Sequence, residues 1–103
     1  VISDRQKMAE NGIIIILISV DKKDGKVLTR PSVISRGFVY MKESQEISDQ
    51  VASKAEKAYR NLIEKKPGAK RSEIKKYIKS SVEKFTRQKL DRKPLIIPII
   101  DSI

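Results

Sequence analysis

The most apolar stretch lies near the start of the chain. After Gly12 it reads Ile13-Ile14-Ile15-Ile16-Leu17-Ile18-Ser19-Val20. β-branched residues dominate the run, and its length is typical of a strand rather than a helix. Apolar side chains fall on both faces of such a strand, so we expect it to lie in the middle of its sheet.

A turn and a second strand are predicted next. Asp24-Gly25 is a strong hairpin signal because glycine adopts the backbone conformation that a tight turn requires. The chain should then return as a strand over residues 27–40. Pro31 has no amide hydrogen, which predicts a bulge or an edge location at that point.

Two amphipathic helices follow. The first is predicted to begin at Ser44, a residue type that caps helices well, and to end before Pro67-Gly68. The second should begin near Ser72 and end before Pro94. In both, apolar residues recur at three- and four-residue spacing and form one stripe. The stripes are Ile47, Val51, Ala55, Ala58, Tyr59 and Leu62 in the first, and Ile74, Ile78, Val82 and Phe85 in the second.

A third strand closes the pattern. Leu95-Ile96-Ile97-Pro98-Ile99-Ile100 is apolar throughout, and Pro98 places it at an edge because proline donates no ladder hydrogen bond. The predicted class is therefore α+β, a three-stranded sheet with two helices packed on one face, in the order strand-strand-helix-helix-strand. We expect one domain over residues 12–103, with residues 1–11 as a lead-in segment or linker remnant. A start at Val1 and an apolar end at Ile103 suggest a piece of a longer polypeptide.

The first and third strands carry one more apolar row than the helices can cover. Two helices bury one face of a sheet, so the other row would form an exposed patch of several hundred Å². At about 25 cal/mol per Å², burying such a patch contributes several kcal/mol. We expect it to dock a second copy or another domain of the same protein. The candidate interface residues are Ile14, Ile16, Ile18, Ile96 and Ile100. The alternative is that the N-terminal segment, with Ile2 and Met8, folds back over this face.

The composition argues against catalysis by this chain. It has no histidine and no cysteine, so the usual zinc site, a Cys–His pair and a Ser–His–Asp triad are excluded. Asp21, Asp24 and Glu43 are oxygen ligands of the kind that hold Mg²⁺, but the first two belong to the predicted turn, where acidic residues are common. We therefore expect no catalytic residues, no metal ligands and no cofactor. No apolar run approaches the ~20 residues that cross a bilayer, so no membrane partner is expected.

The charge is strongly basic and unevenly placed. Formal net charge is +10, and residues 70–93 hold ten basic residues against three acidic ones. Such a surface is typical of salt-dependent binding to a phosphate backbone. The candidate RNA contacts are Lys75, Lys76, Lys79, Lys84 and Arg87. The alternative is a merely solvated helix face, since two Phe and three Tyr offer little for base stacking.

Two stretches resemble the C-terminal domain of ribonuclease J. The first is Ile34-Ser35 followed by the signature Arg36, Gly37, Phe38, Val39 and Tyr40, and the second is the ending from Arg92 to Ile100. The apolar first strand, the Asp-Gly turn and the helix start at Ser72 fall in the same order, so the likeness covers nearly the whole chain.

The resemblance implies an accessory role. Ribonuclease J is a cytoplasmic bacterial RNA-degrading enzyme, with 5′-to-3′ exonuclease and endonuclease activity, built on a metallo-β-lactamase domain with a β-CASP insertion. Its zinc, or another divalent metal, is held in that catalytic part, and none of its metal motifs occurs in this chain. The C-terminal domain in that family is associated with oligomerisation and full activity.

Two functions remain open at this point. The first is a non-catalytic domain that supports oligomerisation and positions the catalytic part of a ribonuclease J-like protein, which handles RNA in the cytoplasm. The absence of cysteine is consistent with that location. The second is a free-standing nucleic-acid-binding module that uses its basic second helix.

Overall fold

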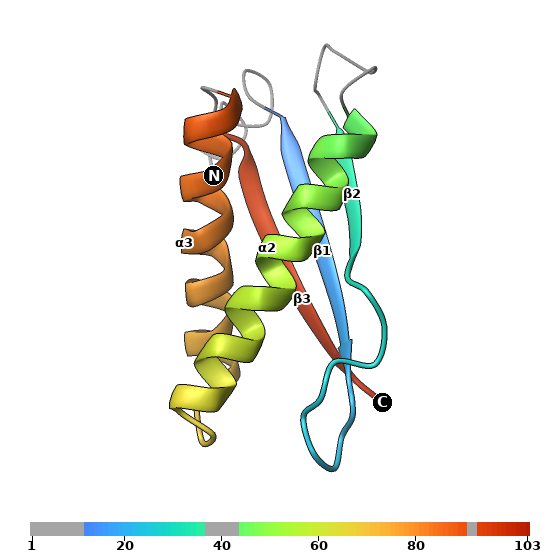
Figure 1. The fold of residues 1–103 in the computed structure, drawn as a ribbon, viewed down its shortest axis with the longest axis vertical. Helices are drawn as coiled ribbons and strands as arrows, with labels where there is room; N and C mark the ends of the chain where they lie inside the picture. The colour runs from blue at the N-terminus through green and yellow to red at the C-terminus, as the bar shows by residue number, and fades with distance from the viewer. Residues whose placement is uncertain (1–11, 37–43, 91–92) are drawn as a thin grey trace.

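A computed structural model describes residues 12–36, 44–90 and 93–103. Within these ranges the predicted order and the α+β class are confirmed, as Figure 1 shows. The elements are β1 (Ile13–Val20), β2 (Ser32–Arg36), α2 (Ser44–Lys65), α3 (Arg71–Leu90) and β3 (Leu95–Ser102).

The sheet has the order β2-β1-β3, so the doubly apolar strand lies in the middle as predicted. β1 pairs antiparallel with β2, where Ile15 faces Ile34, and parallel with β3, where Ile15 faces Ile97. Pro98 lies on the edge strand β3, where its missing amide hydrogen costs no ladder bond.

The second strand is shorter than the sequence predicted. It begins at Ser32, directly after Pro31, and Val27 contributes only an isolated bridge to Val20. Proline at the strand entrance has no amide hydrogen to donate, which explains the late start. The predicted extension over residues 37–40 and the lead-in segment 1–11 lie outside the described residues.

The Asp-Gly turn joins β1 to the return segment. Asp21 donates its amide hydrogen to the carbonyl of Lys26 at 2.8 Å, and Gly25 has a φ of +73°, a left-handed conformation that glycine adopts without strain. The hydroxyl of Tyr59, on α2, donates a hydrogen bond to the Gly25 carbonyl at 2.7 Å. This bond ties the turn to the helix layer.

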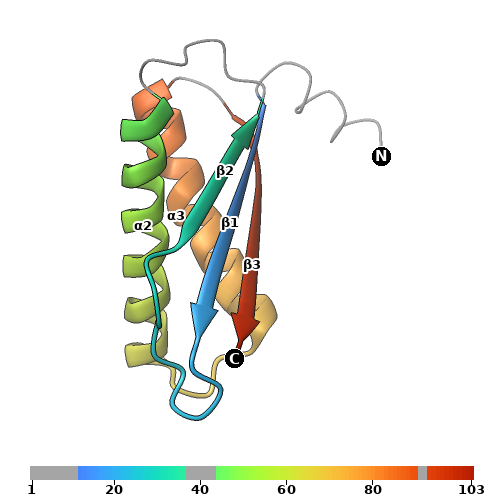
Figure 2. The same cartoon turned by 90° about the vertical axis from the view of Figure 1, so that its right-hand side faces the viewer.

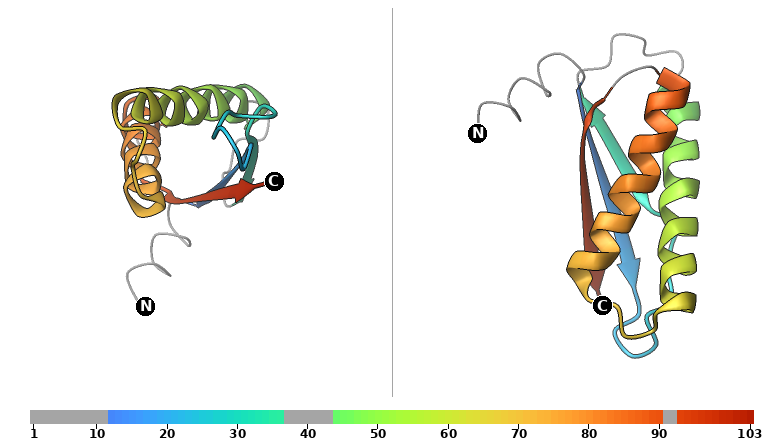
Figure 3. Two further views of the ribbon diagram at one scale, coloured as in Figure 1. Left: turned by 90° about the horizontal axis from the view of Figure 1, so that it is seen from below. Right: turned by 90° about the vertical axis from the view of Figure 1, so that its left-hand side faces the viewer.

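Both helices lie on one side of the sheet, and no described helix covers the other side (Figures 2 and 3). They run in opposite directions and are joined by a short turn. The predicted stripes form the core, with Val51, Ala55, Ile78 and Val82 completely buried. Two arginines add ties between layers: Arg30 donates to the Asp49 carbonyl at 2.8 Å, and Arg71 donates to the Ile100 carbonyl at 3.3 Å.

Candidate functional site

The row of β1 and β3 that faces the helices is the hydrophobic core. It contains all five candidate interface residues, which are at most 7% exposed. The row predicted from the sequence as the interface is therefore the wrong one: its side chains pack against α2 and α3 and are not available to a partner. The five are Ile14, Ile16, Ile18, Ile96 and Ile100.

The opposite row forms an apolar surface that we call the outer face. Its most exposed members are Leu17 on β1, Ile34 on β2 and Ile99 on β3, at 36%, 48% and 43%. The strand register places the outward-facing residues of the three strands side by side on one surface of the sheet. The outer face consists of Ile13, Ile15, Leu17, Ile34, Leu95, Ile97 and Ile99.

Two apolar residues next to the strands adjoin the same end of the sheet. The amide of Leu28 donates to the Ser19 carbonyl at 2.9 Å, and that of Ile103 donates to the Val20 carbonyl at 3.0 Å. Of the six large apolar side chains that are exposed in the described residues, five belong to the strands or to these two neighbours. Apolar exposure is thus concentrated on the sheet rather than scattered over the molecule, and a concentrated patch marks an interaction surface.

Charges stand at two opposite corners of the outer face. Arg36 on β2 pairs with Ile13 at one end of β1, and Asp101 on β3 pairs with Ser19 near the other end. Both side chains are exposed. The Arg36 guanidinium also donates to the carbonyl of Ser35 at 2.9 Å, whereas signature residues 37–40 lie outside the described ranges.

The size of the outer face follows from strand geometry. Eight residues of β1 at ~3.3 Å each give a length of about 26 Å, and three strands at ~4.8 Å give a width of about 14 Å. The face therefore covers about 350 Å², which is within the range of the largest apolar patches found on monomers, and such patches are often functional.

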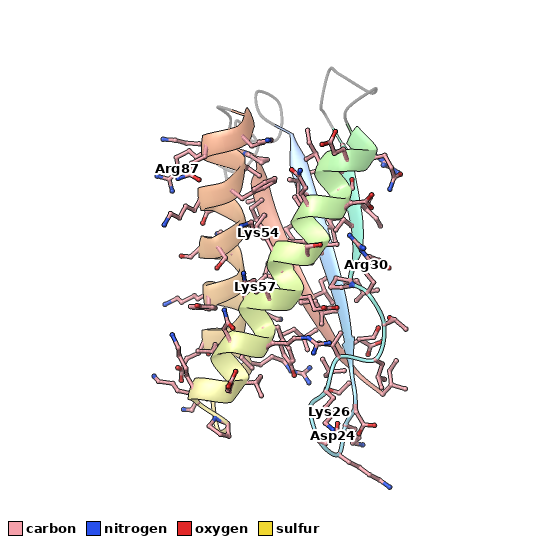
Figure 4. All side chains as sticks on the ribbon, in the orientation of Figure 1. Asp24, Lys26, Arg30, Lys54, Lys57 and Arg87 are labelled. Atoms are coloured by element: carbon pink, nitrogen blue, oxygen red, sulfur yellow. The ribbon has the colours of Figure 1, made fainter. Side chains whose placement is uncertain are left out.

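The five candidate RNA contacts do not form one surface. Lys75 and Lys84 are nine residues apart, which is two and a half helical turns, so they lie on opposite sides of α3. Lys75 and Lys79 are half-buried, while Lys76, Lys84 and Arg87 are exposed. Figure 4 shows Arg87 pointing away from α2. The predicted basic face is therefore split among several directions.

The acidic residues of the turn have a structural role. Asp21 accepts a hydrogen bond on its carboxylate from the amide of Lys23 at 2.7 Å, and Asp24 accepts one from the amide of Lys26 at 2.9 Å (Figure 4 labels Asp24 and Lys26). Glu43 lies outside the described residues. Within those ranges, no three Asp or Glu residues gather closely enough to hold a metal ion. The zinc implied by the ribonuclease J resemblance therefore finds no matching ligands in the described part of this chain.

The sequence contains a signal that could have identified the outer face. Asp101 falls on the same row of β3 as Ile97 and Ile99, and a charged side chain points to the solvent side of a sheet. Extending the predicted strand past Ile100 would have placed that row outside and Ile96 inside. Arg36 carries the same signal on β2 once its pairing with Ile13 is known.

No described helix is long and apolar enough to cross a bilayer.

Fold and surface together define a small basic α+β domain whose most prominent surface feature is an apolar sheet face. Comparison with known proteins gives its family: the family model of the ribonuclease J C-terminal domain matches residues 1–103, and the chain belongs to that family. It is 36% identical to ribonuclease J 2 of Staphylococcus epidermidis and 35% identical to ribonuclease J 2 of Staphylococcus aureus, each over 106 aligned residues. The alignments cover 100% of this chain but only 18% of each of these relatives.

Proposed function

We propose that this chain is the non-catalytic assembly domain of a ribonuclease J-like RNA-degrading protein, and that its outer face pairs with the outer face of a second copy. The proposal rests mainly on the exposure of Leu17, Ile34 and Ile99, which lie on neighbouring strands of one sheet face. Pairing two such faces removes both apolar surfaces from water at once. The two attached catalytic parts are then held at a fixed separation.

Charge complementarity favours a second copy as the occupant. Arg36 and Asp101 stand at opposite corners of the outer face. A two-fold axis that lies in the face, midway between the two residues and perpendicular to the line joining them, exchanges their positions. Arg36 then comes over the partner's Asp101. Self-complementary pairing of this kind is what a symmetric dimer requires.

The small area of the outer face predicts a weak dimer. Two faces of about 350 Å² bury about 700 Å² together, which is below the ~1,200 Å² of a stable standard interface. Such a contact acts as one of several in a larger assembly, where tethering to the catalytic parts raises its effective concentration. RNA as substrate, a divalent metal in the catalytic part, and a cytoplasmic location belong to the same proposal and rest on the family membership.

The test is the mass of the 103-residue chain in solution. Sedimentation equilibrium from micromolar to millimolar concentration should show a monomer that converts to a dimer as concentration rises. Replacing Leu17 and Ile99 with lysine should abolish the conversion, because two buried unpaired charges per copy would oppose it.

The control uses a residue of equal exposure elsewhere. Tyr77 on α3 is 37% exposed, close to the 36% of Leu17, so Tyr77→Lys adds a similar charge at a similar site off the sheet. That variant should dimerise as the wild type does, and circular dichroism should show all variants folded. A chain that stays monomeric at millimolar concentration contradicts the proposal, as does dimerisation that survives Leu17→Lys with Ile99→Lys.

A further inference from the structure

A groove of about 440 Å³ runs between α2 and α3. The long polar side chains that line it are Lys54, Lys57 and Asn61 on α2, and Tyr77, Lys84 and Gln88 on α3. Figure 4 shows Lys54 and Lys57 on the side of α2 toward α3. Of these six residues only Lys84 belongs to the basic set that the sequence predicted.

The lining of the groove is positively charged. Three lysines line it, and no Asp or Glu does. In the described part of the chain the two ion pairs use Arg60 and Lys66, so neither neutralises a groove lysine. Clustered cations attract anionic ligands and raise their local concentration.

Aromatic groups lie among these cations. Tyr77 is 37% exposed, and Phe85 is half-buried in the wall of the groove. Exposed aromatic rings provide stacking platforms for unpaired bases, and a neighbouring lysine row follows the phosphates. The amides of Asn61 and Gln88 are donors and acceptors of the type that bind base edges.

The spacing favours a linear ligand. On α3, Tyr77, Lys84 and Gln88 stand at intervals of seven and four residues, a single stripe about 16 Å long. On α2, Lys54, Lys57 and Asn61 form a facing stripe of about 10 Å. A volume of 440 Å³ is that of a small-molecule pocket, which suits one or two nucleotide units.

We propose that the groove between α2 and α3 binds a segment of single-stranded RNA, with Lys54, Lys57 and Lys84 on the phosphates and Tyr77 stacked on a base. The choice of RNA among polyanions rests on the proposed function of the parent protein. The site itself rests on the groove and its charge, and it shares no residue with the outer face.

The experiment is a fluorescence-anisotropy titration of the 103-residue chain with a labelled uridine oligomer of about ten nucleotides, a length typical of single-strand sites. Three phosphate contacts predict a log–log salt slope of about −2, so affinity should fall about 20-fold between 50 and 200 mM salt. Replacing Lys54, Lys57 and Lys84 with glutamine should weaken binding at least tenfold at the lower salt and flatten that slope. Tyr77→Leu should weaken binding about fivefold or more.

The matched control removes the same charge outside the groove. A triple variant of Lys76, Lys79 and Arg87 to glutamine also loses three positive charges, all of them from α3, and should retain most of the affinity. Equal losses in the two triple variants would overturn the groove as the site. Binding of an RNA duplex or of a polyglutamate chain as tightly as the uridine oligomer would overturn single-stranded RNA as its ligand.

The two proposals fail separately. Groove variants leave the outer face intact, so they should dimerise normally in sedimentation equilibrium. A chain that binds the uridine oligomer but never dimerises would overturn the assembly role alone, and a chain that dimerises but does not bind the oligomer would overturn the groove alone.

Discussion

At the scale of single residues, the ties between layers come from a few polar groups. Tyr59 is 4% exposed, yet its hydroxyl reaches the Gly25 carbonyl at 2.7 Å. Burial raises the pKa of Tyr59 above its ordinary value near 10, with Asp24 adding to the rise and Arg71 opposing it. The neutral phenol is therefore the form that the folded state prefers.

Tyr59→Phe should lower the free energy of unfolding by about 1 kcal/mol at neutral pH, because it removes one hydrogen bond. The raised pKa sets the sign of the pH dependence. The wild type keeps its full stability advantage over Tyr59→Phe below pH 10, near the pKa of tyrosine in the unfolded chain. The advantage shrinks as the pH rises from there through the higher pKa of Tyr59 in the folded state. Urea unfolding of both proteins between pH 8 and 11 measures this, and an advantage that stays constant or grows over that range would contradict it.

Gly25→Ala should destabilise the domain by about 1 to 2 kcal/mol, because alanine is strained at a φ of +73°. An added methyl would lie 3.6 Å from the Tyr59 hydroxyl, an ordinary contact, so the cost is one of backbone conformation. Gly68→Ala is the control: its position is open, without a left-handed φ, and a change within about 0.5 kcal/mol or a slight gain is expected. Thermal unfolding of the two variants measures the difference, and equal losses of stability would contradict the explanation from backbone conformation.

At the scale of elements, the sequence was sufficient for the order of strands and helices but not for the facing of β1. Length, β-branched content and the two prolines identify the central and edge strands. The two rows of β1 differ in polarity only at their last position, Ser19 in one row and Val20 in the other, so periodicity gives little indication of which row meets the helices. The stronger signal comes from the neighbouring strands, where Arg36 and Asp101 place charged side chains on the outer row.

The same limit explains why the basic groove between α2 and α3 was not predicted from the sequence. A single helix shows which of its residues share a stripe, but Lys54 and Lys84 are brought together by the packing of two helices, 30 positions apart in sequence. No charge count along the chain contains that information. The lysines of α2 were missed for this reason.

Truncation of adjacent residues of β1 should destabilise the domain to very different extents. Ile16 is completely buried against the helices, so Ile16→Ala should cost about 2 to 5 kcal/mol of unfolding free energy. Leu17 lies on the outer face, so Leu17→Ala should cost about 1 kcal/mol or less in the monomer. Chemical denaturation at low protein concentration measures both, and a larger loss at Leu17 would reverse the assignment of the two rows.

At the scale of the whole molecule, a net charge of +10 acts on both proposed activities, with opposite sign. Two copies of the domain repel each other, and salt screens this repulsion. An RNA strand is attracted, and salt weakens that attraction.

Raising salt from 50 to 300 mM should therefore strengthen dimerisation of the chain while weakening its binding of RNA. Sedimentation equilibrium and fluorescence anisotropy on one preparation measure the two trends. Weakening of both activities by salt would contradict the prediction that the net charge controls dimerisation.

The parallel pairing of β1 with β3 has a consequence for how quickly the domain forms. Leu95 faces Ile13 although it follows it by 82 residues, and both helices intervene. Closing so long a loop costs chain entropy before any ladder bond repays it, so the domain should fold slowly for its size. Until β3 arrives, the most apolar strand of the chain has an open edge, and that interval is when misassembly with other chains is most probable.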